Sequence, residues 1–267
     1  MNASQPFPII AVDIGNNRIK LGRFESSCGE RLPLPTHTLH VAGSAESMDL
    51  IGAWLADGPP CCSWWIGSVN RPATTRLVNW LRLHGQSRIM LLAAGDLALR
   101  VELPRPDMVG IDRLLDAVAA NALRDPRRGA VIVDVGTAIT VDLLSADGVF
   151  RGGAIAPGIA MSARALHEFT DLLPQIDMLE LGTPPSPLGA STPDAMRSGL
   201  FWGAVGAIRE LVGRLSLTLS RPPQLFLTGG AGPPVASLLG PEARHVPHLT
   251  LAGIAVTASA QAEGGTG

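Results

Sequence analysis

One short pattern occurs twice in this chain. Residues 9–21 read IIAVDIGNNRIKL and residues 130–142 read AVIVDVGTAITVD. Each copy is an apolar run, an Asp-x-Gly, small polar residues and a second, partly apolar run. Short apolar runs on both sides of a Gly-containing turn predict two strands joined as a hairpin. Two such hairpins, far apart along the chain, predict two related domains.

Strand and helix patterns alternate around the two hairpins. Beyond the hairpins, helical spacing is found at 45–58, 74–85, 111–125, after residue 158, at about 194–219 and in a final Ala-rich segment, and further strand patterns at 63–69, 88–94, 149–155 and 224–228. Such alternation is typical of the α/β class. The Pro-rich stretch at 103–110 marks a boundary, so we expect domains at 1–109 and 110–267.

Composition excludes several classes of function. The net charge is -2 and no long run of Lys or Arg occurs, so the sequence does not favour nucleic acid as a main partner. No uninterrupted apolar run reaches the roughly 18 residues that cross a membrane. Charged residues make up only 16% of the chain, which predicts a neutral surface or one buried against another subunit.

Cysteine and histidine patterns give no sign of a disulfide framework or a zinc site. Cys28, Cys61 and Cys62 form neither a CxxC motif nor an even set, which favours a reducing cytoplasm. Two histidine pairs, 37 with 40 and 245 with 248, lie in segments that contain Pro and are interpreted as loops, without a nearby Cys or paired acids. We therefore do not expect zinc.

The Asp-x-Gly turns have the chemistry of a phosphate site. Gly lets backbone N–H groups approach an anion closely, small polar residues add donors, and the aspartate at the strand end can hold a hydrated divalent cation. A single Asp-x-Gly is common turn chemistry and predicts little alone. Two copies in matching strand contexts predict two hairpins that hold a polyphosphate.

These duplicated hairpins resemble those of the actin, Hsp70 and sugar-kinase superfamily of phosphotransferases, and the full set of motifs resembles the type III pantothenate kinase family. The matching segments, in chain order, are DIGNNRIK (13–20), IGSVNRP (66–72), GIDR (110–113), VDVGTAITVD (133–142), GGAIAPG (152–158), STPDAMRSG (191–199) and LTGGAG (227–232). The resemblance implies an α/β fold of two ribonuclease H-like domains, an actin-like ATPase duplication, with a nucleotide cleft between them. It also implies phosphorylation of pantothenate by ATP, the first step of coenzyme A biosynthesis, in a cytoplasmic homodimer.

The resemblance assigns the nucleotide and metal sites. The residues implied to hold the ATP phosphates are Asp13, Gly15, Asn16, Asn17, Arg18 and Lys20. Asp13 is also implied to hold Mg²⁺ through water. In the second hairpin, Thr137 is implied to contact ATP and Asp134 to bind a monovalent cation, K⁺ or NH₄⁺. The glycines of LTGGAG are implied to lie near the adenosine.

The resemblance also assigns the substrate site. The residues implied to bind pantothenate are Gly110, Ile111, Asp112, Arg113 and Thr192, the last reaching the site of a partner subunit. Asp112 is the implied catalytic base. An alcohol is a poor nucleophile, and a carboxylate within hydrogen-bond reach can take its proton as the phosphoryl group moves. Judged by residue type alone, Asp112 is equally an acidic residue favoured by the dipole at a helix N-terminus.

Two positions depart from the family pattern. Asn17 stands where the family usually has Thr, and since Asn can still donate to a phosphate, the function is expected to survive. Leu103 stands where the family tends to have Tyr, so a pantothenate contact is expected to be lost or replaced.

Two alternative functions stay open. One is a nucleotide-binding accessory or regulatory protein that keeps the fold without turnover. The other is a different member of the superfamily, such as a polyphosphate or small-molecule phosphatase, which is not expected to carry the GIDR motif followed by this helix.

Overall fold

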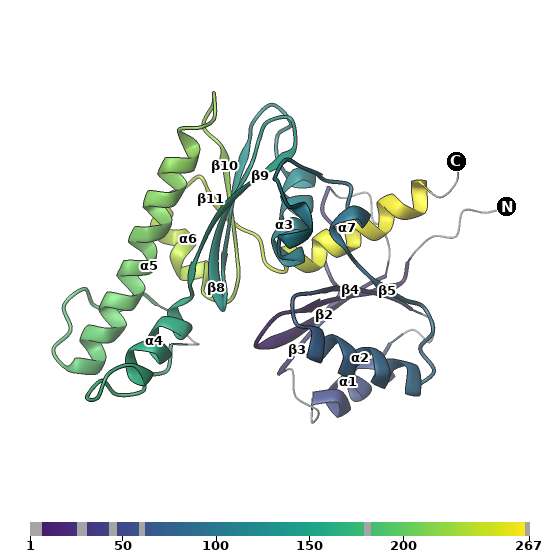
Figure 1. Ribbon diagram of the computed structural model, residues 1–267, viewed down its shortest axis with the longest axis horizontal. Coiled ribbons are helices and arrows are strands. Elements are labelled where there is room, and N and C mark those ends of the chain that lie inside the picture. Colours follow the sequence, from purple (N-terminus) through teal and green to yellow (C-terminus); the bar gives the residue numbers. More distant parts are fainter. Residues whose placement is uncertain (1–6, 26–30, 43–46, 59–61, 179–182, 265–267) are drawn as a thin grey trace. The chain divides into compact units, whose positions relative to one another are not determined.

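The computed structural model describes residues 7–25, 31–42, 47–58, 62–178 and 183–264 (Figure 1). Cys28, Cys61 and the first residues of the helix expected at 45–58 lie outside this part of the chain. The chain divides into two compact units. The first contains Met1–Leu123 and His248–Gly267, and the second contains Arg124–Pro247.

The first unit is an α/β unit built on one mixed sheet. Its elements are β1 (Ile9–Ile14), β2 (Arg18–Phe24), β3 (His37–Ala42), α1 (Ser47–Ala56), β4 (Ser63–Ser68), α2 (Arg71–Leu83), β5 (Ile89–Leu91), η1 (Ala94–Asp96), β6 (Arg100–Val101), η2 (Pro106–Met108), α3 (Ile111–Leu123) and α7 (Leu249–Gly264). The sheet order is β3-β2-β1-β4-β5. Strand β1 runs antiparallel to β2 and parallel to β4, so the expected first hairpin is confirmed.

Helices cover both faces of this sheet (Figure 1). Every residue of β1 is buried, as its nearly continuous apolar sequence predicts for a central strand. On one face, α1 and α2 pack through Ile51, Leu77 and Leu81. On the other, a Cβ at Gly67 of β4 would lie 2.6 Å from Leu115 Cδ1 of α3. The absence of a side chain at Gly67 therefore lets α3 approach the strand that neighbours β1.

The second unit repeats this topology. Its elements are β7 (Ala130–Val135), β8 (Ala138–Leu144), β9 (Val149–Pro157), α4 (Ile159–Glu168), α5 (Thr192–Ser216), β10 (Gln224–Thr228), α6 (Gly232–Leu239) and β11 (Ala243–His245). These strands stand in the order β11-β10-β7-β8-β9. Strand β7 runs antiparallel to β8 and parallel to β10, as β1 does to β2 and β4. The expected duplication is confirmed.

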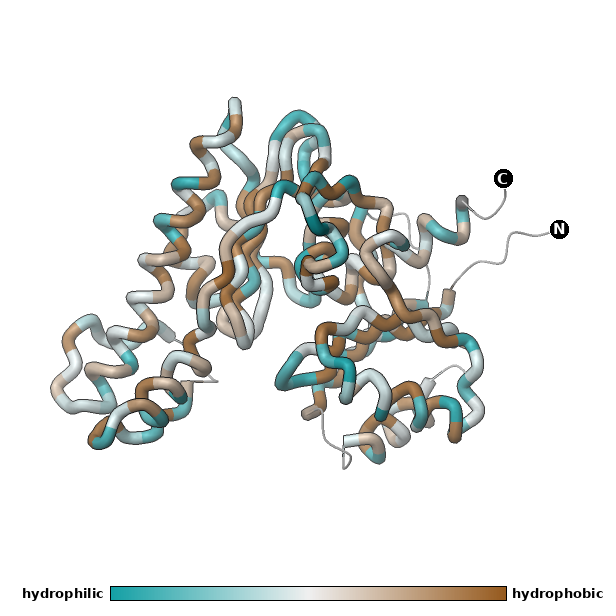
Figure 2. The backbone as a smooth tube through the Cα atoms, viewed as in Figure 1, coloured by the Kyte–Doolittle hydropathy of each residue, from teal (hydrophilic) through white to brown (hydrophobic). Residues whose placement is uncertain are grey.

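A second apolar core lies between this sheet and its helices. It contains Val131 and Val133 of β7, Val141 of β8, and Phe201 and Val205 of α5. In Figure 2 the strands of both units are predominantly hydrophobic, which fits sheets buried by helices. No helix in the described residues is long and apolar enough to cross a membrane.

Among the described residues, six elements were not predicted from the sequence: β3, η1, β6, η2, α6 and β11. The loop interpretation of the histidine pairs is wrong for three residues, because His37 and His40 lie on β3 and His245 lies on β11. Short strands that pair only through distant neighbours give little local pattern. Helices α3 and α7 belong to the first unit, whereas the expected boundary after residue 109 assigns them to the second domain. That boundary stays a prediction.

Candidate active site

The first hairpin carries an ion pair beside its turn. Asp13 of β1 and Lys20 of β2 are directly opposite in the strand register. Lys20 Nζ lies 3.1 Å from Asp13 Oδ2, and the two side chains are 33% and 8% exposed. Because opposite residues of antiparallel strands project to one face, both charges lie on the same side of the sheet. A buried carboxylate is thus held beside a cation that solvent can reach.

The turn of this hairpin is exposed, and a hydrogen bond from the segment after β4 holds it in place. Asn16, Asn17 and Arg18 are exposed, and the Gly15 N–H donates to the Arg18 carbonyl at 3.0 Å. The segment after β4 holds the turn, since the Asn70 amide donates to the Asn16 carbonyl at 3.4 Å. The same Asn70 caps helix α2 by accepting the Ala73 N–H through its side-chain oxygen. The IGSVNRP motif therefore positions the first turn.

Asp112 lies near this hairpin, in the first turn of α3. Its Oδ1 accepts the backbone N–H of Arg113 at 2.9 Å. Burial raises the pKa of Asp112, the hydrogen bond from Arg113 opposes this shift, and the negative charge of Asp13 adds to it. The positive charge of Lys20 lowers the pKa of Asp112. The first unit thus brings Asp13, Lys20 and Asp112 into one electrostatic cluster.

The second hairpin differs from the first in one charge and in length. Asp134 of β7 stands opposite Thr140 of β8, where the first hairpin has Lys20. Val135 pairs with Ile139, which leaves residues 136–138 in the turn, whereas residues 15–18 form the first turn. The position equivalent to Lys20 is therefore neutral in the second unit.

Gly229, immediately after β10, packs against Asp134. Its φ is +91°, and a Cβ there would meet Asp134 Oδ1 and the Val135 carbonyl. Thr137, in the turn, accepts the Gly158 N–H on its carbonyl at 3.0 Å. The LTGGAG and GGAIAPG motifs thus close around the second hairpin, and their glycines leave room for its carboxylate and backbone.

Thr192 is exposed at the start of α5. The cap of this helix is the preceding residue, because Ser191 Oγ accepts the Asp194 N–H at 3.3 Å. Asp134, Thr137 and Thr192 belong to the second unit, whereas Asp13, Lys20 and the GIDR residues belong to the first. The predicted site residues therefore form two sets, one in each unit.

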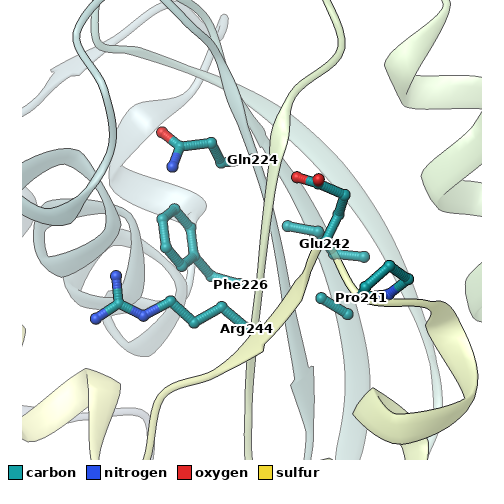
Figure 3. Close-up of a pocket in the computed structure, with 7 residues that line it drawn as sticks. Gln224, Phe226, Pro241, Glu242 and Arg244 are labelled. Carbon is teal, nitrogen blue, oxygen red and sulfur yellow. The ribbon is translucent and has the colours of Figure 1, made fainter.

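A cavity in the second unit contains none of the predicted residues. It has a volume of about 400 Å³ and is lined by Gln224, Leu225, Phe226, Pro241, Glu242, Ala243 and Arg244. Figure 3 shows that Gln224, Phe226 and Arg244 project to the same side of β10 and β11. The cavity lies at the start of β10, whereas LTGGAG follows the end of that strand. It is not part of the predicted nucleotide site.

Sequence reasoning missed two residues close to the predicted ones, His40 and His248, and it predicted no contact between Gly229 of LTGGAG and Asp134. A Cβ at Gly229 would meet the Asp134 carboxylate, and His40 stands opposite Lys20 in the register of β2 and β3. The ring of His248 lies 5.8 Å from the ring of His40, measured between centroids. The Gly-Gly pair in the sequence is a signal for the positive φ of Gly229. No sequence pattern indicates that His40 and His248 are neighbours, because the segment of β3 is interpreted from the sequence as a loop.

Comparison with known proteins gives one consistent family. A family model described as type III pantothenate kinase matches residues 9–214. A type III pantothenate kinase of Dehalococcoides mccartyi (strain CBDB1) is 34% identical over 263 residues, which cover 92% of this chain and 93% of the relative. One of Maricaulis maris is 35% identical over 222 residues, covering 80% of this chain and 81% of the relative.

A solved structure supports the fold. The crystal structure of a protein described as a Baf family transcriptional activator from Campylobacter jejuni superposes with a TM-score of 0.60. It is 20% identical and the match covers 95% of this chain and 98% of that chain. At this identity the likeness concerns the fold alone.

Proposed function

Because the chain belongs to the type III pantothenate kinase family, we propose that it transfers the terminal phosphoryl group of ATP to the primary hydroxyl of pantothenate. This reaction is the first step of coenzyme A biosynthesis. The observation that carries the proposal is the electrostatic cluster of Asp13, Lys20 and Asp112. These three residues lie within the part of the chain that the family model matches, residues 9–214. The cluster joins a phosphate hairpin to a carboxylate suited to act as a base.

Asp112 is the base in this proposal. Its carboxylate accepts the hydroxyl proton of pantothenate as the oxygen attacks the terminal phosphorus and the bond to ADP breaks. The raised pKa fits this role, since a general base works best when its pKa moves toward the operating pH. Gly110, Ile111 and Arg113 hold the substrate around it.

The first hairpin binds the phosphates. Its exposed turn, Asn16 to Arg18, offers donors, and Lys20 adds a positive charge. The Asp13 carboxylate is a hard oxygen donor of the kind that Mg²⁺ prefers, and it fits a role in holding the ion through water. When bound, Mg²⁺ neutralises charge on the phosphates. Thr137 contacts ATP from the second hairpin.

Asp134 binds a monovalent cation in this proposal. The duplicated topology makes Asp13 and Asp134 equivalent, yet their opposite residues are Lys20 and Thr140. A fixed ammonium group accompanies the first aspartate, and a K⁺ or NH₄⁺ ion would supply the positive charge at the second. The carboxylate and the nearby Val135 carbonyl are oxygen donors that fit such an ion.

The protein acts as a homodimer in the cytoplasm in this proposal, with Thr192 contributing to the site of its partner. Large apolar side chains are exposed on and after α4, including Met161 at 45%, Phe169 at 84% and Leu172 at 87%. Leu188, close to Thr192, is 83% exposed. Exposed apolar surface of this kind commonly marks a protein interface.

Mixed dimers test the shared site. Asp112→Asn and Thr192→Ala protomers should each be impaired as homodimers, whereas a mixed dimer has one site with both residues intact. Random exchange should then restore roughly a quarter of wild-type activity, since half the dimers are mixed and half their sites are intact. Mixtures no more active than the separate variants would place Thr192 in its own subunit's site or outside the site.

The reaction is tested by ADP release from purified protein with and without pantothenate, in potassium and in sodium buffer. We expect release that requires pantothenate and is stimulated by potassium. Equal release with pantothenate in both salts would support the kinase activity and contradict the assignment of a monovalent cation to Asp134. No release from folded protein that binds ATP would favour the accessory protein.

A further inference from the structure

A row of polar side chains crosses the first sheet beyond the predicted phosphate site. Asp13 stands opposite Lys20, and Lys20 stands opposite His40 on β3. All three therefore project to one face of the sheet. Exposure increases along the row, from 8% for the Asp13 side chain to 33% for Lys20, and His40 is exposed. The row leads from a buried carboxylate to an imidazole that a ligand can reach.

His248 completes the outer end of this row. Its ring is 5.8 Å from that of His40, with 63° between the ring planes. Its backbone has a φ of 57°, and its carbonyl accepts the Ala252 N–H at 3.0 Å in the first turn of α7. A left-handed conformation is uncommon for residues other than Gly and strains the backbone. Such outliers cluster at ligand sites.

The charges around the pair favour an anion. The groups that act on His40 are His248, Lys20 and Arg18, which are basic, and Asp13, which is acidic. His40 is exposed as a whole residue, but partial desolvation of its imidazole lowers its pKa most, followed by His248 and the two cations. The neutral imidazole keeps one N–H donor. A metal cation would be repelled by Lys20 and Arg18, whereas a phosphate oxygen would accept from the imidazole and be attracted by both cations.

We propose that His40 and His248 extend the first hairpin's phosphate site and hydrogen-bond to the polyphosphate of the nucleotide. The inference rests on the proposed function, which places ATP phosphates at Asp13 and Lys20. Neighbouring strands lie about 4.8 Å apart, so His40 is one strand spacing beyond Lys20. A phosphate that contacts Lys20 on one side is then within reach of the imidazole on the other.

Calorimetric binding of ATP, inorganic tripolyphosphate and adenosine to the full-length protein tests this. His40→Ala should raise the Kd for ATP and for tripolyphosphate about tenfold, the effect of losing one hydrogen bond to a charged group. It should leave the Kd for adenosine unchanged. His40→Gln keeps an N–H donor and should recover most of the lost affinity. His248→Gly, which removes the imidazole and adopts the left-handed backbone readily, should weaken ATP binding in the same way.

His37→Ala is the matched control. His37 is exposed on the same strand, three positions before His40, so it projects to the opposite face and should leave all three Kd values unchanged. Wild-type ATP affinity in His40→Ala would overturn the inference, and so would equal losses for adenosine and ATP. If the wild type phosphorylates pantothenate and His40→Ala binds ATP normally, only this inference is contradicted. If the wild type binds ATP but does not phosphorylate pantothenate, only the proposed function is contradicted. If the wild type binds neither ATP nor tripolyphosphate, both are contradicted.

Discussion

Lys20 holds its ammonium group 3.1 Å from the carboxylate of Asp13 across the β1–β2 hairpin. The equivalent hairpin of the second unit pairs Asp134 with Thr140. The two hairpins thus share one backbone topology but differ in charge, because only the first has a lysine opposite its aspartate. Under the function proposed above, the two hairpins neutralise phosphate charge differently, the first with the Lys20 side chain and the second with a bound cation.

Thr140→Lys should reduce the dependence on the monovalent cation. A lysine at this position would stand opposite Asp134 and supply the charge that we assign to K⁺, as Lys20 does for Asp13. The measurement is turnover in potassium and in sodium buffer. We expect activity in sodium to rise toward that in potassium. Thr140→Val is the control and should keep the potassium dependence; an unchanged salt ratio in Thr140→Lys would contradict the assignment.

Asp112→Asn should abolish turnover without weakening the fold. Loss of the base should lower kcat by about 10² to 10⁴ while ATP affinity stays unchanged. Burial raises the pKa of Asp112 in the folded state, so the ionised carboxylate disfavours folding at neutral pH. The variant should therefore unfold at an equal or higher denaturant concentration. A variant that retains more than a tenth of wild-type turnover removes Asp112 from the role of base.

The pH profile should show the raised pKa of Asp112. The base acts when it is deprotonated, so kcat/KM should fall as pH decreases through this pKa. The acid limb should lie above 3.8, the ordinary value for this carboxyl group, because burial is the largest influence on it. The stabilising contribution of the protonated form is present below 3.8 and is lost as pH rises through the folded-state pKa. An acid limb at or below 3.8 would be inconsistent with this assignment.

Gly229→Ala should be far more harmful than Gly230→Ala. A Cβ at Gly229 would meet Asp134 Oδ1 at a φ of +91°, whereas nothing lies within 4 Å of a Cβ at Gly230. The left-handed backbone alone should cost about 1–2 kcal/mol of unfolding free energy. Potassium activation should also fall, because the carboxylate must move. Denaturant unfolding and the salt ratio measure both effects, and equal behaviour of the two variants would contradict the role of Gly229.

The sequence by itself determined both hairpins, the α/β class and the position of Asp112 at a helix start. These features depend on local patterns, namely apolar runs of strand length, Gly-containing turns and a helical spacing that begins at Ile111. Strand β1 is buried along its whole length and β7 is buried everywhere except at the half-buried Asp134, so their apolar residues carry the signal directly. The resemblance to the kinase family rested on the same local segments.

Tertiary structure alone decided the contacts between distant segments. Strand β3 is largely exposed and β11 has only three residues, so neither has an apolar pattern, and each exists because a neighbouring strand pairs with it. The contact of His40 with His248 joins β3 to the start of α7. Gly229 reaches Asp134 because β10 lies parallel to β7. Local sequence periodicity carries no information on such pairings, which depend on how the packed chain returns on itself.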